Sequence, residues 1–141
     1  MEKSPPQKPA LDYAFLAEYA RVEGNSLTAV GASFTLLEVP SFPLTTTVYV
    51  AGRFRAPEHG DPFAVSVTAG KADDEPAITM ATTFDPKDAL HPYRDRVGIT
   101  FAVGLPVQFA TAGLKQVSIL IEDEPVRDLY FEVTGPTDDA E

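Results

Sequence analysis

Apolar and polar residues alternate along most of the chain, and this period of two predicts β-strands. In 44–55, Leu44, Thr46, Val48, Val50 and Phe54 share one side, opposite a row of threonine, tyrosine and arginine. The same reading predicts eight strands, at 12–22, 27–34, 44–55, 63–67, 77–84, 97–103, 114–122 and 126–133. No segment follows the helical period of about 3.6 residues. The pattern therefore predicts an all-β fold.

Turn-forming residues separate the predicted strands. The run 23–26, Glu-Gly-Asn-Ser, predicts a hairpin between the first two strands, and the run 123–125, Asp-Glu-Pro, predicts another near the end. The first strand is partly apolar on both faces, which is typical of a central strand. Gly104 and Pro106 are expected to end the sixth strand. In the long loop 85–93, Pro86 suits the first position of one helical turn after Asp85.

The sequence shows no internal repeat and no change of composition along its length, which predicts a single domain. We expect an antiparallel two-sheet β-sandwich of about eight strands over residues 11–134, with a partly closed β-barrel as the alternative. The proline-rich residues 1–10 are predicted to form a disordered leader, and residues 135–141 a disordered acidic tail.

The chain is strongly acidic and has no cysteine. Among 141 residues, 21 acidic against 11 basic side chains give a net charge of −10, which repels phosphate backbones and anionic lipid surfaces. We therefore expect neither a nucleic-acid partner nor a membrane partner. The charged start of the chain lacks the apolar stretch of a secretory signal, and no run reaches the ~18 apolar residues of a membrane span. A cytoplasmic protein is expected.

Two stretches of the chain carry a family resemblance. They are DYAFLAEYARVEGNSLTAVGASFTLLEVPSFP near the start and FATAGLKQVSILIEDEPVRDLYFEV near the end. The chain resembles an uncharacterised bacterial family of small single-domain proteins, described as a domain of unknown function. The closing stretch is also similar to immunoglobulin-like sandwiches. The resemblance implies the fold and a bacterial origin, and it carries over no catalytic residue.

The residue types that perform catalysis are sparse. His59 and His91 are the two histidines, both lie in predicted loops, and no cysteine is present to complete a zinc site with them. The serines lack a nucleophile-elbow context, and the glycines are dispersed at turns rather than gathered in a phosphate-binding loop. We therefore predict a protein that is not an enzyme and uses no cofactor.

Acidic residues recur in the loops expected at one end of the sandwich. If successive strands reverse direction, Glu23, the 58–61 loop, the 85–91 loop and the 122–124 turn all lie there. Calcium prefers oxygen ligands that converge in this way. The candidate ligands are Asp61, Asp85, Asp88 and Asp123, although the net charge favours the simpler interpretation that these carboxylates are solvated.

Four side chains are candidates for an interface, because the alternation places them opposite the core rows: Tyr49, Arg53, Arg55 and Tyr130. The chain has no tryptophan for a sugar-binding platform. The predicted function is therefore that of a non-catalytic interaction or structural protein, associating with a protein partner or with itself as a homodimer. The alternative is a calcium- or small-ligand-binding module that uses the acidic loops.

Overall fold

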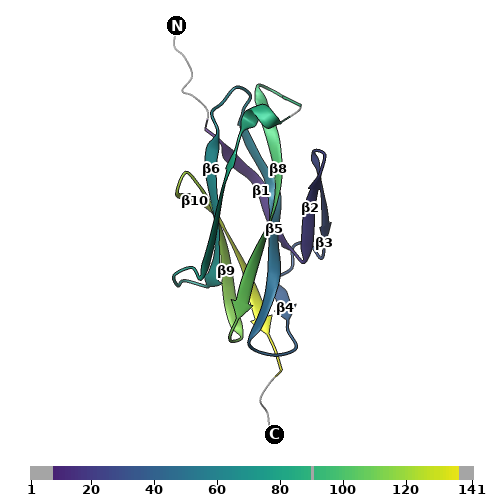
Figure 1. Ribbon diagram of the computed structural model, residues 1–141, viewed down its shortest axis with the longest axis vertical. Helices are drawn as coiled ribbons and strands as arrows, with labels where there is room; N and C mark the ends of the chain where they lie inside the picture. Colours follow the sequence, from purple (N-terminus) through teal and green to yellow (C-terminus); the bar gives the residue numbers. More distant parts are fainter. Residues whose placement is uncertain (1–7, 90, 137–141) are drawn as a thin grey trace.

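The computed structural model describes residues 8–89 and 91–136 and has an all-β fold (Figure 1). In these residues the strands are β1 (Ala10–Ala17), β2 (Tyr19–Glu23), β3 (Ser26–Val30), β4 (Leu36–Glu38), β5 (Leu44–Pro57), β6 (Phe63–Lys71), β7 (Ile78–Phe84), β8 (Arg96–Phe109), β9 (Gly113–Ile121) and β10 (Glu124–Thr134). In the described residues one 3-10 turn, Pro86–Asp88, follows β7; it begins at Pro86 as predicted, and Asp85 is its N-cap.

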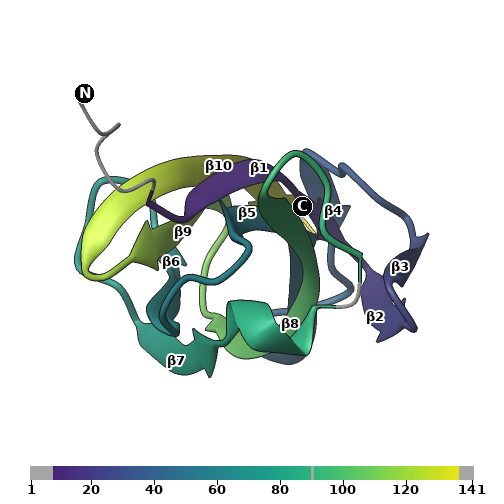
Figure 2. The ribbon, with the colours of Figure 1, turned by 90° about the horizontal axis from the view of Figure 1, so that it is seen from above.

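Two open sheets pack face to face in these residues. One has the strand order β1-β5-β8 and the other β4-β10-β9-β6-β7, and a separate hairpin pairs β2 with β3. Figure 2 shows β8 between β7 on one side and this hairpin on the other. None of the described sheets closes on itself, so the predicted sandwich is confirmed and the partly closed barrel is not the arrangement found.

The core lies between the two sheets and is formed by the predicted inner rows. Phe54 of β5 is its centre, with its ring centroid 4.6 Å from that of Phe101 and 5.7 Å from that of Phe63. The largest fully buried side chains around it are aliphatic: Leu105, Ile119, Val48, Val50, Val65, Val67, Val117 and Val133. Burial of these rows supplies the main driving force for folding.

The predicted first strand is two strands, because the chain reverses at Glu18. β1 is an edge strand, so the expectation of a central strand is wrong. Its second apolar face is covered by the β2–β3 hairpin, through a small cluster centred on Ala17, Ala20 and Ala51. The hairpin turn itself is as predicted, with Gly24 at a φ of +65°. β1 and β5 approach so closely that a Cβ at Gly52 would lie 2.0 Å from the carbonyl oxygen of Tyr13.

Two further features differ from the sequence prediction. β8 continues through Gly104 and Pro106 to Phe109 instead of ending there. Proline is tolerated because β8 is an edge strand, where a missing N–H need not break a ladder bond. The short strand β4 pairs in parallel with β10, the one parallel pair among the described strands. Three residues give too little alternation for a strand to be recognised from the sequence.

The predicted leader, 1–10, and tail, 135–141, fall mostly outside the described residues. Within those residues β1 already begins at Ala10, and Gly135 packs against the ring of Phe42. The described part of the chain contains no helix that is long and apolar enough to cross a membrane.

Candidate functional site

The open side of the sandwich, between the edge strands β7 and β8, is the most distinctive surface of the molecule. We call it the β7–β8 seam. The two packed sheets differ in width, with five strands against three, and β7 extends beyond the cover of the smaller sheet. Met80 pairs with the buried Val67 and so belongs to the inward-facing row, yet it is 40% exposed. Thr82, on the same row, is also exposed. The inner face of β7 is therefore open along the seam.

Two hollows lie end to end along this seam. One, of about 460 Å³, lies between Met80–Thr82 of β7 and Thr100–Gly104 of β8. The other, of about 370 Å³, lies farther along the same strands, between Ile78 of β7 and Pro106–Phe109 of β8. We call the second hollow the Lys115 cleft. Both volumes are in the range of small-ligand pockets.

The two strands that border the seam carry almost no charge. β7 has no charged residue, and β8 has none after Arg96, although the chain contains 32 charged side chains (21 acidic and 11 basic). The other edges carry one carboxylate each, Asp12 on β1 and Glu38 on β4. Charged side chains on edge strands oppose pairing with another chain. The seam lacks this protection.

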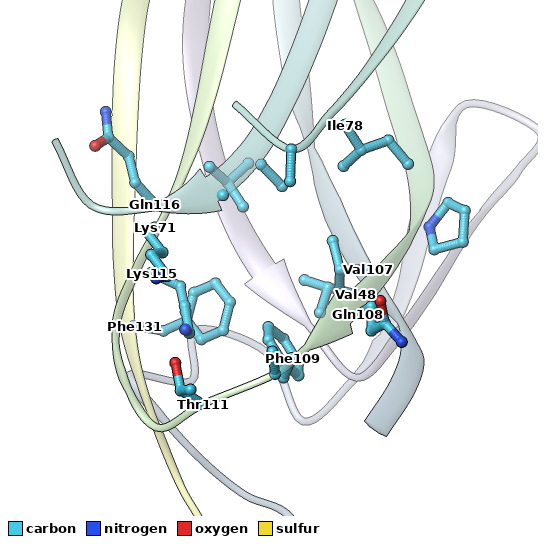
Figure 3. Close-up of a pocket in the computed structure, with 16 residues that line it drawn as sticks. Val48, Lys71, Ile78, Val107, Gln108, Phe109, Thr111, Lys115, Gln116 and Phe131 are labelled. Carbon is cyan, nitrogen blue, oxygen red and sulfur yellow. The ribbon is translucent and has the colours of Figure 1, made fainter. Parts of the chain in front are cut away.

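Lys115 of β9 is the one buried charged residue among the described residues, with 6% of its surface exposed. It continues the inward row of Val117, Ile119 and Ile121, so the strand directs it between the sheets. In the view of Figure 3 it lies with Phe131 and Thr111 on one side of the cleft, facing Val107 and Phe109.

The ammonium group of Lys115 has an apolar environment. Its Nζ lies 5.9 Å from the centroid of the Phe109 ring, and no carboxylate of the described residues forms an ion pair with it. Burial, and to a smaller extent the neighbouring Lys71, lowers the pKa of Lys115 below its usual value. Lys71 is the cross-strand partner of Lys115, so two cations meet at this end of the core.

The arrangement fits the chemistry of anion binding. A carboxylate in the Lys115 cleft would accept charge-assisted hydrogen bonds from the Lys115 ammonium, and the hydroxyl of Thr111 is a further possible donor in the lining. Val48, Val107 and Ile78 would contact an apolar stem attached to that carboxylate. The cleft therefore combines the cations of Lys115 and Lys71 with walls that are largely apolar and also carry the amides of Gln108 and Gln116.

Lys115 was not among the predicted site residues, although the sequence contains the signal for it. Lys115 lies on the same face of its strand as Val117, Ile119 and Ile121, and the alternation places that face in the core. A lysine on a core row is unusual, because burying an unpaired charge is unfavourable. A lysine at such a position therefore indicates a candidate site residue.

The acidic loops do share one end of the sandwich, as predicted. Pro57 pairs with Arg96, Phe63 with Phe84, and Val65 with Ile121, which brings the three corresponding loops together. The candidate ligands Asp61, Asp85, Asp88 and Asp123 nevertheless do not converge, since no three acidic or histidine side chains of the described residues could hold a metal ion. Asp85 instead accepts a hydrogen bond from the backbone N–H of Lys87.

The predicted interface residues occupy different environments. Tyr49 is not an exposed ring as expected, because the β2–β3 hairpin covers it and Tyr19 packs edge-on against it at 5.3 Å. Arg53 donates from Nε to Asp12 at 2.9 Å and lies over the Tyr13 ring.

The other two interface candidates lie apart from each other. Arg55 lies over the ring of Tyr93, with 5.2 Å between its guanidinium carbon and the ring centroid. Tyr130 remains exposed, at 44%, on the outer face of the larger sheet. The four residues therefore do not form one patch, and none of them lines either hollow of the seam.

Comparisons with known proteins identify a family and a distant structural likeness. The model of a family of unknown function, DUF6941, matches residues 12–134. No curated protein matches the chain. Among solved structures, the chain is similar to a β-glucosidase from Listeria innocua, solved in complex with glucose, with a TM-score of 0.45 and 12% identity. The likeness covers 72% of this chain but only 15% of the enzyme, and at this score it carries no argument about function.

Proposed function

The chain belongs to DUF6941, a family of unknown function, and from its geometry we propose that it is a non-catalytic binding domain. The proposed site is the Lys115 cleft, and the proposed ligand is a partner that presents an anionic group on an apolar stem. The observation that carries the proposal is a buried lysine that faces a cleft without a carboxylate partner among the described residues.

The energetics favour an anionic ligand over a neutral one. A buried ammonium without a counter-ion loses hydration and gains little in return. A carboxylate entering the cleft would supply the missing charge, while its stem covers apolar atoms of Val48 and Ile78. A neutral alcohol would gain the apolar contacts and could accept a hydrogen bond from Lys115, but it would leave the ammonium without a counter-charge. We therefore expect the cleft to discriminate between an acid and the matching alcohol.

This proposal keeps the association function expected from the sequence but moves its site. The seam replaces the scattered set Tyr49, Arg53, Arg55 and Tyr130 as the binding surface. No observation favours the calcium alternative, since the acidic loops do not form a cluster in the described residues. The non-catalytic role, the cytoplasmic location and the bacterial origin remain predictions.

Hexanoate and 1-hexanol test the proposal, because they share an apolar stem and differ in charge. We expect hexanoate to raise the melting temperature of the protein, since a ligand at ten times its Kd adds about 1.4 kcal/mol of stability. Hexanol, and sodium chloride at matched ionic strength, should produce smaller shifts. Differential scanning calorimetry measures all three.

A pair of matched lysine variants locates the effect. Lys115→Met should abolish the advantage of hexanoate over hexanol, whereas Lys87→Met, on the exposed 3-10 turn, should retain it. Equal hexanoate shifts in both variants would show that the anion binds elsewhere and would remove the Lys115 cleft as the site.

A further inference from the structure

The seam has the geometry of a site for an additional strand. β7 has a hydrogen-bonded neighbour only in β6, and β8 only in β5, so each has one free edge, and hollows lined by both strands open along them. Edge strands expose unpaired backbone N–H and C=O groups that bind extended peptides. Here β7 has no charged side chain, and β8 has none after Arg96. Backbone pairing at the seam therefore meets no electrostatic opposition.

The side chains along the seam provide apolar contacts for such a strand. Met80 is exposed on the inward row of β7, and Ile99 and Val103 of β8 are only partly buried. In the described residues, no strand pairs with the free edges of β7 and β8, and the β2–β3 hairpin, which packs against β8, contributes only Val22 to the hollow beside Met80. An added strand with apolar residues at alternate positions would place them over these three side chains. Its opposite row would face solvent.

We infer that the β7–β8 seam binds the C-terminal segment of a partner protein as an added β-strand, antiparallel to β7, with its terminal carboxylate at Lys115. The inference rests on the proposed function and names the class of its ligand. Charge complementarity selects this occupant, because β7 is uncharged along its length and Lys115, the one buried charge of the described residues, lines the cleft. The acidic side chains of Asp73–Glu75 lie on the turn before β7, so the cation available to a carboxylate is that of Lys115 inside the cleft.

Strand direction explains why the segment should be C-terminal. β7 begins at Ile78, beside the Lys115 cleft, and runs away from it. A strand antiparallel to β7 therefore runs toward the cleft and delivers its carboxyl end there. Ala110 and Thr111, which follow β8, also line the cleft. Seven residues, the length of β7, span about 23 Å when extended, so a short tail is sufficient.

A library of random C-terminal heptapeptides tests the inference. The peptides are displayed on a carrier protein with free carboxyl ends and selected against the full chain. We expect enriched sequences to carry apolar residues at alternate positions. A synthetic peptide of an enriched sequence should bind at least tenfold more tightly as the free acid than as the amide, measured by fluorescence anisotropy. In Lys115→Met, the acid and the amide should bind equally.

Two exposed side chains of similar accessibility give a matched control for the strand contact. Met80→Asn should weaken binding of the selected peptide at least fivefold, whereas Tyr130→Asn, on the outer face, should leave it unchanged.

Three results would overturn the inference. The first is equal binding of the acid and amide peptides to the unmodified protein. The second is a library selection that enriches no peptide although hexanoate still binds. The third is a homodimer of this protein that Met80→Asn dissociates, because the occupant of the seam would then be a second copy of the chain. If hexanoate also fails to bind, the proposed function falls with the inference.

Discussion

Replacing Phe54 by alanine is expected to lower the free energy of unfolding by about 3–5 kcal/mol, the usual cost of removing a large buried aromatic side chain. Phe54 is fully buried, and its ring contacts those of Phe63, Phe84 and Phe101 from both sheets. Loss of the ring would leave a cavity where the sheets meet. Urea unfolding measures the effect, and thermal unfolding should shift down by more than about 10 °C.

An exposed aromatic residue provides the control for this result. Tyr130→Ala removes a ring of similar size from the outer face and should change stability by less than about 0.5 kcal/mol. If Phe54→Ala proves too unstable to purify, Phe54→Leu should still cost about 1–1.5 kcal/mol. A Phe54 variant as stable as Tyr130→Ala would contradict the sandwich core described above.

Replacing Lys115 by methionine is expected to raise the free energy of unfolding by at most about 1 kcal/mol at pH 7, because the gain from removing a charge without a carboxylate partner among the described residues is offset in part by loss of the cation–π contact with Phe109. The fold lowers the pKa of this amine, so the folded state disfavours its charged form. The penalty is complete below the pKa in the folded protein and disappears as the pH rises through the ordinary value of 10.5. The advantage of methionine should therefore shrink between neutral pH and about pH 10.5.

Lys87→Met separates burial from a general change of net charge. Lys87 is exposed, so its replacement removes the same charge without relieving a buried one. Its effect on stability should be small and should not follow the pH dependence of Lys115→Met. A loss of stability in Lys115→Met that persists at high pH would contradict the description of Lys115 as an unpaired buried cation.

The alternation of residues was sufficient to predict the sandwich because a period of two directly marks which side chains face the core. Val117, Ile119 and Ile121 are all buried as predicted. The ends of the strands could not be predicted as well. β8 continues through Pro106 because it is an edge strand, and the sequence does not show which strands lie at an edge. The predicted central position of β1 is wrong for a related reason. Apolar residues on both of its faces could not distinguish neighbouring strands from a covering hairpin.

The candidate site depended on features that appear only in three dimensions. The seam arises because one sheet is wider than the other, and neither sheet width nor strand order can be read from local patterns. Tyr49 is a second example. The alternation in β5 correctly places it on the outer face of the sheet, but it does not predict that the β2–β3 hairpin covers that face. Lys115 was accessible to sequence reasoning, as a lysine on a core row.

The most direct test of the central claim is the pKa of Lys115 itself, measured by NMR with and without saturating hexanoate. Lysine labelled with ¹³C at the ε position reports the titration of each amine, and Lys115→Met assigns the resonance. We predict a pKa below the usual value in the free protein and an increase when hexanoate binds, because a nearby anion stabilises the ammonium form. A pKa of Lys115 that hexanoate leaves unchanged would contradict the proposal that this cleft is the binding site.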